Sequence, residues 1–130
     1  MKMRPVWYDV SYRRRMDAFD EGLWTRLDTV PTLQPETREA VVRYLLELAC
    51  QSQHVRNIVL GRTALLSLPH QWIIDHIEPY AEPLLRLEDE WEYSRLGELY
   101  EQLDEGLVLR LIARGSSSHD DEIRVAAQDF

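Results

Sequence analysis

The stretch Asp120-Asp121-Glu122-Ile123-Arg124-Val125-Ala126-Ala127-Gln128-Asp129-Phe130 decides the fold prediction. It opens with acids, which the dipole of a helix start favours. Ile123 follows as a branched apolar residue that can point into a core, and Ala127 is small enough to let another helix approach. Gln53-His54-Val55-Arg56-Asn57-Ile58-Val59 is a looser echo of this order. Such segments predict stacked helix pairs, which bury a long core and leave two broad faces for a partner.

Apolar residues recur at helical spacing along most of the chain. We predict helices over 13–28, 35–51 and 53–67, from Pro69 through Leu85, over 90–103 and 105–113, and from about 120 to the end, with a loop at 115–118. Pro79 and Pro83 predict a kink or break near Ile77, because proline removes a backbone donor and clashes with the preceding turn. Residues 58–60 could also form a buried strand, but no partner strand is evident. The predicted fold class is therefore all-α.

The beginning of the chain has a different pattern. Val6, Tyr8, Val10 and Tyr12 alternate with other residues, which is the period of an extended strand. We therefore predict an extended N-terminal arm over 1–12, or else a partly disordered terminus, and one helical domain over 13–130. A length of 130 residues is enough for a single core.

Two windows carry a resemblance to a known family. At Asp121, Ile123, Arg124 and Ala127, and more loosely at Val55, Arg56 and Val59, the sequence resembles HEAT/armadillo-like helical repeats. The resemblance implies an irregular stack of about six or seven helices, an α-solenoid or right-handed superhelix. It also implies a protein-binding role, and structural roles for Arg56 and Arg124, which in the family pair with acids of neighbouring repeats, with Asp121 as the partner type. Some HEAT-like proteins hold damaged DNA on a basic face, and the acidic composition here argues against that branch.

The charge of the chain is unevenly distributed. Residues 1–15 carry +4, so the remainder carries −12 of the total of −8. An acidic body repels phosphate backbones and favours a basic partner, although acidity also simply keeps a protein soluble. The single cysteine, Cys50, lies in an apolar run and is predicted to be buried. No signal-peptide pattern and no membrane-length apolar run is present, which predicts a cytoplasmic protein.

An acidic tract between Glu78 and Glu105 contains ten acids against Arg86 and Arg95. Aromatic residues are interleaved with these acids; aromatics offer rigid contact area and acids steer a cationic partner. We predict a partner-binding surface made of Glu88, Asp89, Glu90, Trp91, Glu92, Tyr93 and Tyr100. The competing interpretation is that the aromatic side chains pack inward and the acids are only solvated.

Other clusters predict little chemistry. His70, Asp75, His76 and Glu78 have a metal-like composition, but the two histidines are six residues apart and would not share a helix face. The acids that follow His119 are explained by the start of a helix. No phosphate-binding loop, nucleophile elbow or catalytic triad pattern is present. We therefore expect no catalytic residues, no metal and no cofactor.

The predicted function is a non-enzymatic protein–protein interaction module with an acidic binding face. One concrete version is an immunity or inhibitor protein against a basic partner, because opposite charge speeds encounter. The alternative is a HEAT-like nucleic-acid-binding protein or enzyme that uses the basic N-terminal arm, where Arg13, Arg14 and Arg15 follow Trp7, Tyr8 and Tyr12.

Overall fold

The computed structural model describes the backbone of residues 7–130 and the side chains from Val10 onward. All regular secondary structure in this part of the chain is helical, so the all-α prediction is confirmed. The α-helices are α1 (Trp7–Phe19), α2 (Pro35–Leu46), α3 (Val55–Leu66), α4 (His70–Arg86), α5 (Glu90–Leu103), α6 (Glu105–Ser116) and α7 (Asp121–Ala127). Two 3₁₀ segments, η1 (Leu23–Thr25) and η2 (Leu27–Thr32), precede α2, and a π-helical segment, η3 (Glu47–Gln51), extends it.

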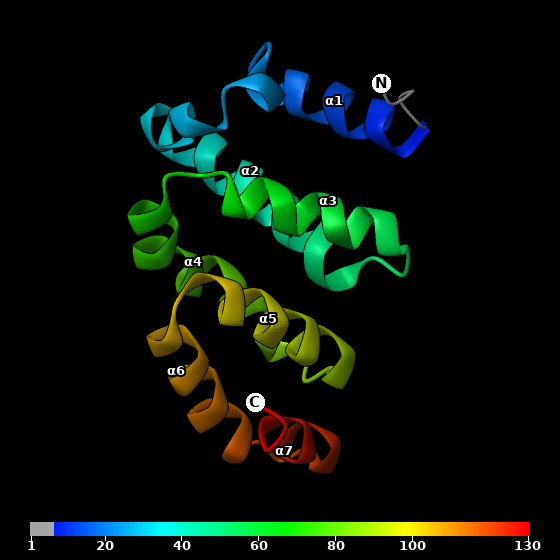
Figure 1. Ribbon diagram of the computed structural model, residues 1–130, viewed down its shortest axis with the longest axis vertical. Helices are drawn as coiled ribbons and strands as arrows, with labels where there is room; N and C mark the ends of the chain where they lie inside the picture. Colours follow the sequence, from blue (N-terminus) through cyan, green and yellow to red (C-terminus); the bar gives the residue numbers. More distant parts are fainter. Residues whose placement is uncertain (1–6) are drawn as a thin grey trace.

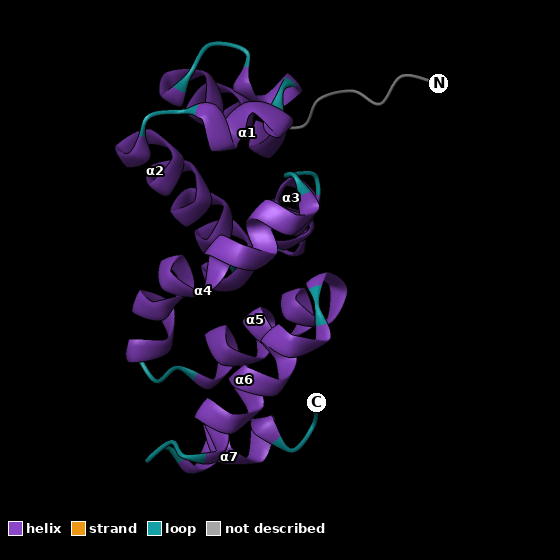
Figure 2. Cartoon of the chain, turned by 90° about the vertical axis from the view of Figure 1, so that its left-hand side faces the viewer, coloured by secondary structure: helices purple, strands orange, loops and turns teal. Residues whose placement is uncertain are grey.

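The helices follow one another along the longest axis of the molecule. Figure 1 shows α1 at one end and α7 at the other, with α3 and α5 between them running in the same direction. Seen from the side, α2 and α4 lie on one flank and α3 and α5 on the other (Figure 2). Contacts join α2 to α4, α3 to α5 and α5 to α7. The chain therefore stacks helices in two layers that share one elongated core.

That core is continuous from the first helix to the last. Ile123, Ala126 and Ala127 continue it in α7. The largest fully buried side chains of the core run from α1 to α6: Met16, Leu23, Val30, Leu45, Leu46, Leu65, Ile73, Ile77, Leu96, Leu99, Tyr100 and Leu107. Cys50 is buried among them, as predicted, and burial raises the pKa of its thiol to about 12. A thiol with so high a pKa is a packing group at neutral pH.

One close helix crossing depends on a glycine. Gly61 in α3 packs against the turn where α2 becomes η3, and a Cβ atom added there would lie 2.6 Å from the Ala49 nitrogen and 2.7 Å from the Leu45 oxygen. Both atoms belong to backbone, which cannot rotate away as a side chain can. The glycine therefore sets the distance between α3 and the end of α2.

Ion pairs connect helices that are neighbours in the stack. Glu78 and Glu82 of α4 accept from Arg110 and Arg114 of α6, at 2.9 and 2.7 Å, and each pair joins residues 32 positions apart. Arg62 of α3 pairs in the same way with Glu98 of α5. Because the side chains of these pairs are partly exposed, each pair adds little to the free energy of unfolding. The pairs nevertheless help to align the helices that they join.

The predicted arm is wrong for residues 7–12, because they belong to α1; residues 1–6 lie outside the described part. The alternation of apolar residues in this segment does not reflect an extended strand. Tyr12 and Met16 are both buried and are the first members of a helical stripe. This first helix ends at Phe19 rather than at 28. Gly22 stops it with a φ of 75°, and its N–H donates to the Asp17 carboxylate at 2.8 Å. Left-handed backbone of this kind favours glycine.

Two further expectations are corrected in the second half of the chain. The expected break near Ile77 does not occur, because α4 is one helix from His70 to Arg86 although Pro79 and Pro83 lie inside it. Both prolines are exposed, and the opposite face of α4 is held in the core by Ile73, Ile77, Ala81 and Leu84. α6 also extends through Ser116, because Gly115 is buried against the Tyr93 ring and hydroxyl. The strand alternative at 58–60 is excluded, since these residues lie within α3.

Candidate interaction surface

The first turn of α5 holds the centre of the predicted surface. Asp89 is the N-cap, and its carboxylate accepts from the Glu92 N–H at 3.1 Å. Glu90 accepts from the Ser94 hydroxyl at 3.1 Å. Trp91 remains 47% exposed, with the Arg95 guanidinium 4.0 Å from the centre of its ring. Asp89 therefore has a structural task, whereas Trp91 presents a large aromatic side chain to solvent.

Tyr93 and Tyr100 do not belong to this surface. Tyr93 is 3% exposed and its hydroxyl donates to the Leu111 carbonyl at 2.8 Å. Tyr100 is 2% exposed, and burial raises the pKa of its phenol. The two rings stand on the inward stripe that also carries Leu96 and Leu103. For these two residues the partner-binding prediction is wrong, and the inward-packing interpretation holds.

Glu92 is turned partly inward. Its Oε2 atom is buried without a hydrogen-bond partner. Burial, and secondly the charge of Asp89, raise the pKa of this carboxyl, while a hydrogen bond with Gln51 lowers it. Glu92 is therefore only partly available as a surface charge.

Several acids of the tract already have partners within the chain. Glu78, Glu82 and Glu98 form the ion pairs described above. Asp104 caps α6 and accepts from the Gly106 N–H at 3.0 Å. The acids of the tract that form no ion pair with a described arginine lie near the start of α5, at residues 88–92, and near its end, at Glu101, Asp104 and Glu105.

Acids from the C-terminal helix join this region. An open groove of about 420 Å³ is lined by Glu90 of α5 and by Asp121, Glu122, Val125, Ala126 and Asp129 from α7 and the turn after it. Val125 is 60% exposed. Sequence reasoning missed these residues because some 30 positions separate them from Glu90, and only the packing of α7 on α5 brings them together.

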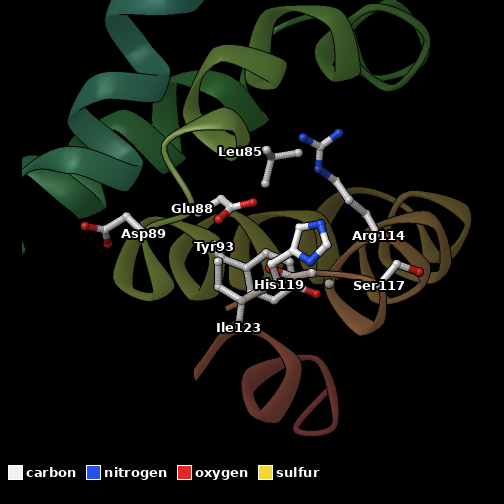
Figure 3. Close-up of a pocket in the computed structure, with 10 residues that line it drawn as sticks. Leu85, Glu88, Asp89, Tyr93, Arg114, Ser117, His119 and Ile123 are labelled. Carbon is white, nitrogen blue, oxygen red and sulfur yellow. The ribbon is translucent and has the colours of Figure 1, made fainter. Parts of the chain in front are cut away.

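Two further hollows adjoin the same turn. A pocket of about 270 Å³ lies between the end of α4, the end of α6 and α7; Figure 3 shows Glu88, Arg114 and His119 gathered around it, while Asp89 points away from them. A hollow of about 550 Å³ is lined by Gln51, Gln53, Asp89, Trp91 and Glu92. Glu88 has a φ of 50°, where an L side chain is disfavoured. The turn from 88 to 92 therefore borders three concave surfaces.

The metal-like clusters are engaged in other contacts. Nδ1 of His76 lies 2.7 Å from the Trp72 carbonyl oxygen, and its ring stacks on the Trp72 indole. Asp75 accepts from Gln71 at 2.8 Å. Asp120 caps α7 by accepting from two backbone N–H groups. Within residues that the structure describes, no group of three or more His, Cys, Asp or Glu side chains could hold a metal ion.

The basic residues near the N-terminus contact aromatic rings of the protein itself. The guanidinium of Arg13 lies 4.3 Å from the centre of the Trp24 ring, and that of Arg15 lies 5.2 Å from the Tyr44 ring centre. Arg14 is exposed. Trp7 and Tyr8 lie in α1, and their side chains are outside the description.

The two arginines of the repeat-like windows behave differently. Arg124 pairs with Asp121 and donates to the Ser118 carbonyl at 2.5 Å, so it fastens the start of α7 to the preceding loop. The Asp121 pair is local, because both residues lie in α7, whereas the resemblance implies a pair with an acid of a neighbouring repeat; that role stays a prediction. Arg56 is exposed at the start of α3, and its structural role stays a prediction. Arginine pairs between stacked helices occur instead at Arg62, Arg110 and Arg114.

Comparison with known proteins returns no match for this chain, whether among family models, curated proteins or solved structures. In the described residues, every helix is too short or too polar to cross a lipid bilayer.

Proposed function

We propose that this protein is a non-enzymatic protein-interaction module that binds a basic partner through an acidic face. We define the acidic face as Glu88, Glu90, Trp91, Glu92, Asp121, Glu122, Val125 and Asp129, with Asp89 as its supporting cap. Apart from Asp121 with Arg124, none of these acids forms an ion pair with a described arginine, and all of them except Glu90 and Glu92 are exposed. Trp91 and Val125 supply exposed apolar area, which a binding surface needs beside charge.

The observation that carries the proposal is where the net charge resides. The first 87 residues contain eleven basic and eleven acidic side chains, whereas the last 43 contain four basic and twelve acidic. All of the net charge of −8 therefore belongs to residues 88–130, which form α5, α6 and α7 at one end of the long axis (Figure 1). Charge that only served solubility would have no reason to gather at one end.

The stacked helices and the pairs from Arg62, Arg110 and Arg114 fit a HEAT-like arrangement, which we propose as the fold type. In such a stack the outer faces are free for a partner. A small acidic module of this kind suits an immunity or inhibitor role against a basic protein, because complementary charge raises the rate of association. The partner we propose is a basic protein rather than nucleic acid, since an acidic face repels phosphates.

The test compares proteins captured from the native host by three immobilised forms. The site variant carries Glu88→Lys, Glu90→Lys and Glu122→Lys. The control carries the same change of charge at Glu21, Asp28 and Glu36, which are exposed in the segment from the end of α1 to the first turn of α2. This segment lies toward the opposite end of the molecule (Figure 1). Asp89 is left intact because loss of an N-cap costs about 0.5–2 kcal/mol of stability.

We expect a basic protein to be retained by the wild type and by the control, to be lost by the site variant and to elute with rising salt. Equal capture by both variants would contradict the acidic face. Tight, salt-sensitive binding of duplex DNA by the wild type would instead favour the nucleic-acid alternative.

A further inference from the structure

The groove between α5 and α7 has an ordered pattern of charge and apolar surface. Glu122, Val125 and Asp129 line it together, at spacings of three and four residues that place them along one side of α7 and the turn after it. Glu90 lines the groove from α5. The groove is thus apolar at Val125 and Ala126 and acidic at both ends and on the α5 side.

The charges of the groove are open to a ligand. Neither Glu122 nor Asp129 forms an ion pair with any arginine in the described residues, and both are exposed. Arg124 is the nearest basic residue in sequence, and its guanidinium is occupied by Asp121 and the Ser118 carbonyl. Glu90 accepts a hydrogen bond from the Ser94 hydroxyl and forms no ion pair with an arginine in the part of the chain that the structure describes.

From this complementarity we infer that the groove binds a cationic amphipathic helix of the partner, with basic side chains about seven residues apart and an apolar side chain between them. Basic residues at positions i and i+7 of a helix face the same side as an apolar residue at i+3 or i+4. This basic–apolar–basic order in the peptide is complementary to the acid–apolar–acid order of Glu122, Val125 and Asp129 in the groove. The inference rests on the proposed acidic face and adds the kind of segment that the face recognises.

The probe is a synthetic helical peptide of about 18 residues, long enough for measurable helicity. Its alanine-rich sequence carries arginine at i and i+7 and leucine at i+3 and i+4. The control peptide has the same composition, with the leucines moved to the opposite side of the helix. Affinities are measured by calorimetry at low salt, for the full chain and its variants.

We expect the patterned peptide to bind at least about tenfold more tightly than the control peptide. Glu122→Lys together with Asp129→Lys lowers its affinity by at least about tenfold, whereas Glu21→Lys together with Asp28→Lys does not. Val125→Ser removes the preference between the two peptides but leaves binding of both, because it deletes the apolar contact and no charge. Val125 is exposed, so this substitution leaves the core intact.

The results separate this inference from the proposal that it rests on. Equal affinity for both peptides, lost in the Glu122 and Asp129 variant, would overturn the patterned groove and leave the acidic face standing. No binding of either peptide at low salt would overturn both. Self-association of the wild type that the Glu122 and Asp129 changes abolish would assign the groove to a second copy of the chain, and would also overturn the inference.

Discussion

Glu88 has a strained backbone conformation and also belongs to the proposed acidic face. Substitutions at this position should separate its effect on stability from its effect on binding. It follows the last turn of α4, and its N–H donates to the Leu85 carbonyl at 3.2 Å with a φ of 50°. Glycine is the residue that most often occupies this position after a helix. A non-glycine residue in the left-handed region costs about 1–2 kcal/mol. The residue in this strained conformation is a glutamate, and its carboxylate borders the pocket shown in Figure 3.

Glu88→Gly removes that strain, while the greater entropy of unfolded glycine takes back about 0.5–1 kcal/mol. The net expectation is a gain of about 0.5–1 kcal/mol in the free energy of unfolding, or roughly 2–5 °C in Tm for a domain of this size. Glu88→Ala is the matched control, because it loses the carboxylate but keeps the Cβ atom. Both variants should weaken capture of the basic partner equally.

Urea unfolding followed by circular dichroism measures the first effect, and binding to the captured partner measures the second. Glu88→Gly that is no more stable than Glu88→Ala would refute the strain argument. Unchanged partner affinity in both variants would remove Glu88 from the acidic face, whatever their stabilities.

Three other substitutions test the packing on which the surface depends. Gly61→Ala should cost about 1–3 kcal/mol or more, seen as a lower urea midpoint, because its Cβ would stand 2.6 Å from the Ala49 nitrogen; a cost well below about 1 kcal/mol would contradict that contact. Tyr93→Phe should lower stability by about 1 kcal/mol through loss of its bond to the Leu111 carbonyl and leave partner affinity unchanged, whereas a fall in affinity alone would return Tyr93 to the surface. The raised pKa of Glu92 means that the folded state binds its proton more readily, so its contribution to stability is present at low pH and lost as pH rises from the ordinary glutamate value through the raised one. Glu92→Gln should therefore flatten the stability–pH curve over that interval and raise stability at neutral pH; an unchanged curve would show that Glu92 is not desolvated.

The helices could be predicted from the sequence wherever the apolar stripe was long. The boundaries of α5 at Glu90 and Leu103 coincide with the prediction, because an acid caps one end and the inward stripe stops at the other. The first helix could not be placed, since the stripe of Tyr12 and Met16 begins inside a segment that also alternates. Short segments support both periods, and only tertiary packing decides between them.

The candidate surface was predictable only in part, for a related reason. Composition located the acids near the start of α5, but it could not tell an inward aromatic from an outward one. Tyr93 and Trp91 are two residues apart on a helix and therefore face different sides. Tyr93 is buried in the core, whereas Trp91 is exposed. Glu122 and Asp129 join the surface through contacts between α5 and α7, and such distant contacts leave no local pattern in the sequence.

The two ends of the molecule differ in net charge. Internal pairs use Arg110 and Arg114 to neutralise acids of α4, which lies outside the charged segment. Residues 88–130 thus use half of their four basic side chains on α4, while Glu88, Glu122 and Asp129 stay exposed. The same pairs align α6 with α4 and support the layer on which α5 and α7 rest. The arginines that hold the stack together therefore also leave the α5–α7 end negative, so a change that breaks either pair would alter both the packing of the helices and the field that a basic partner meets.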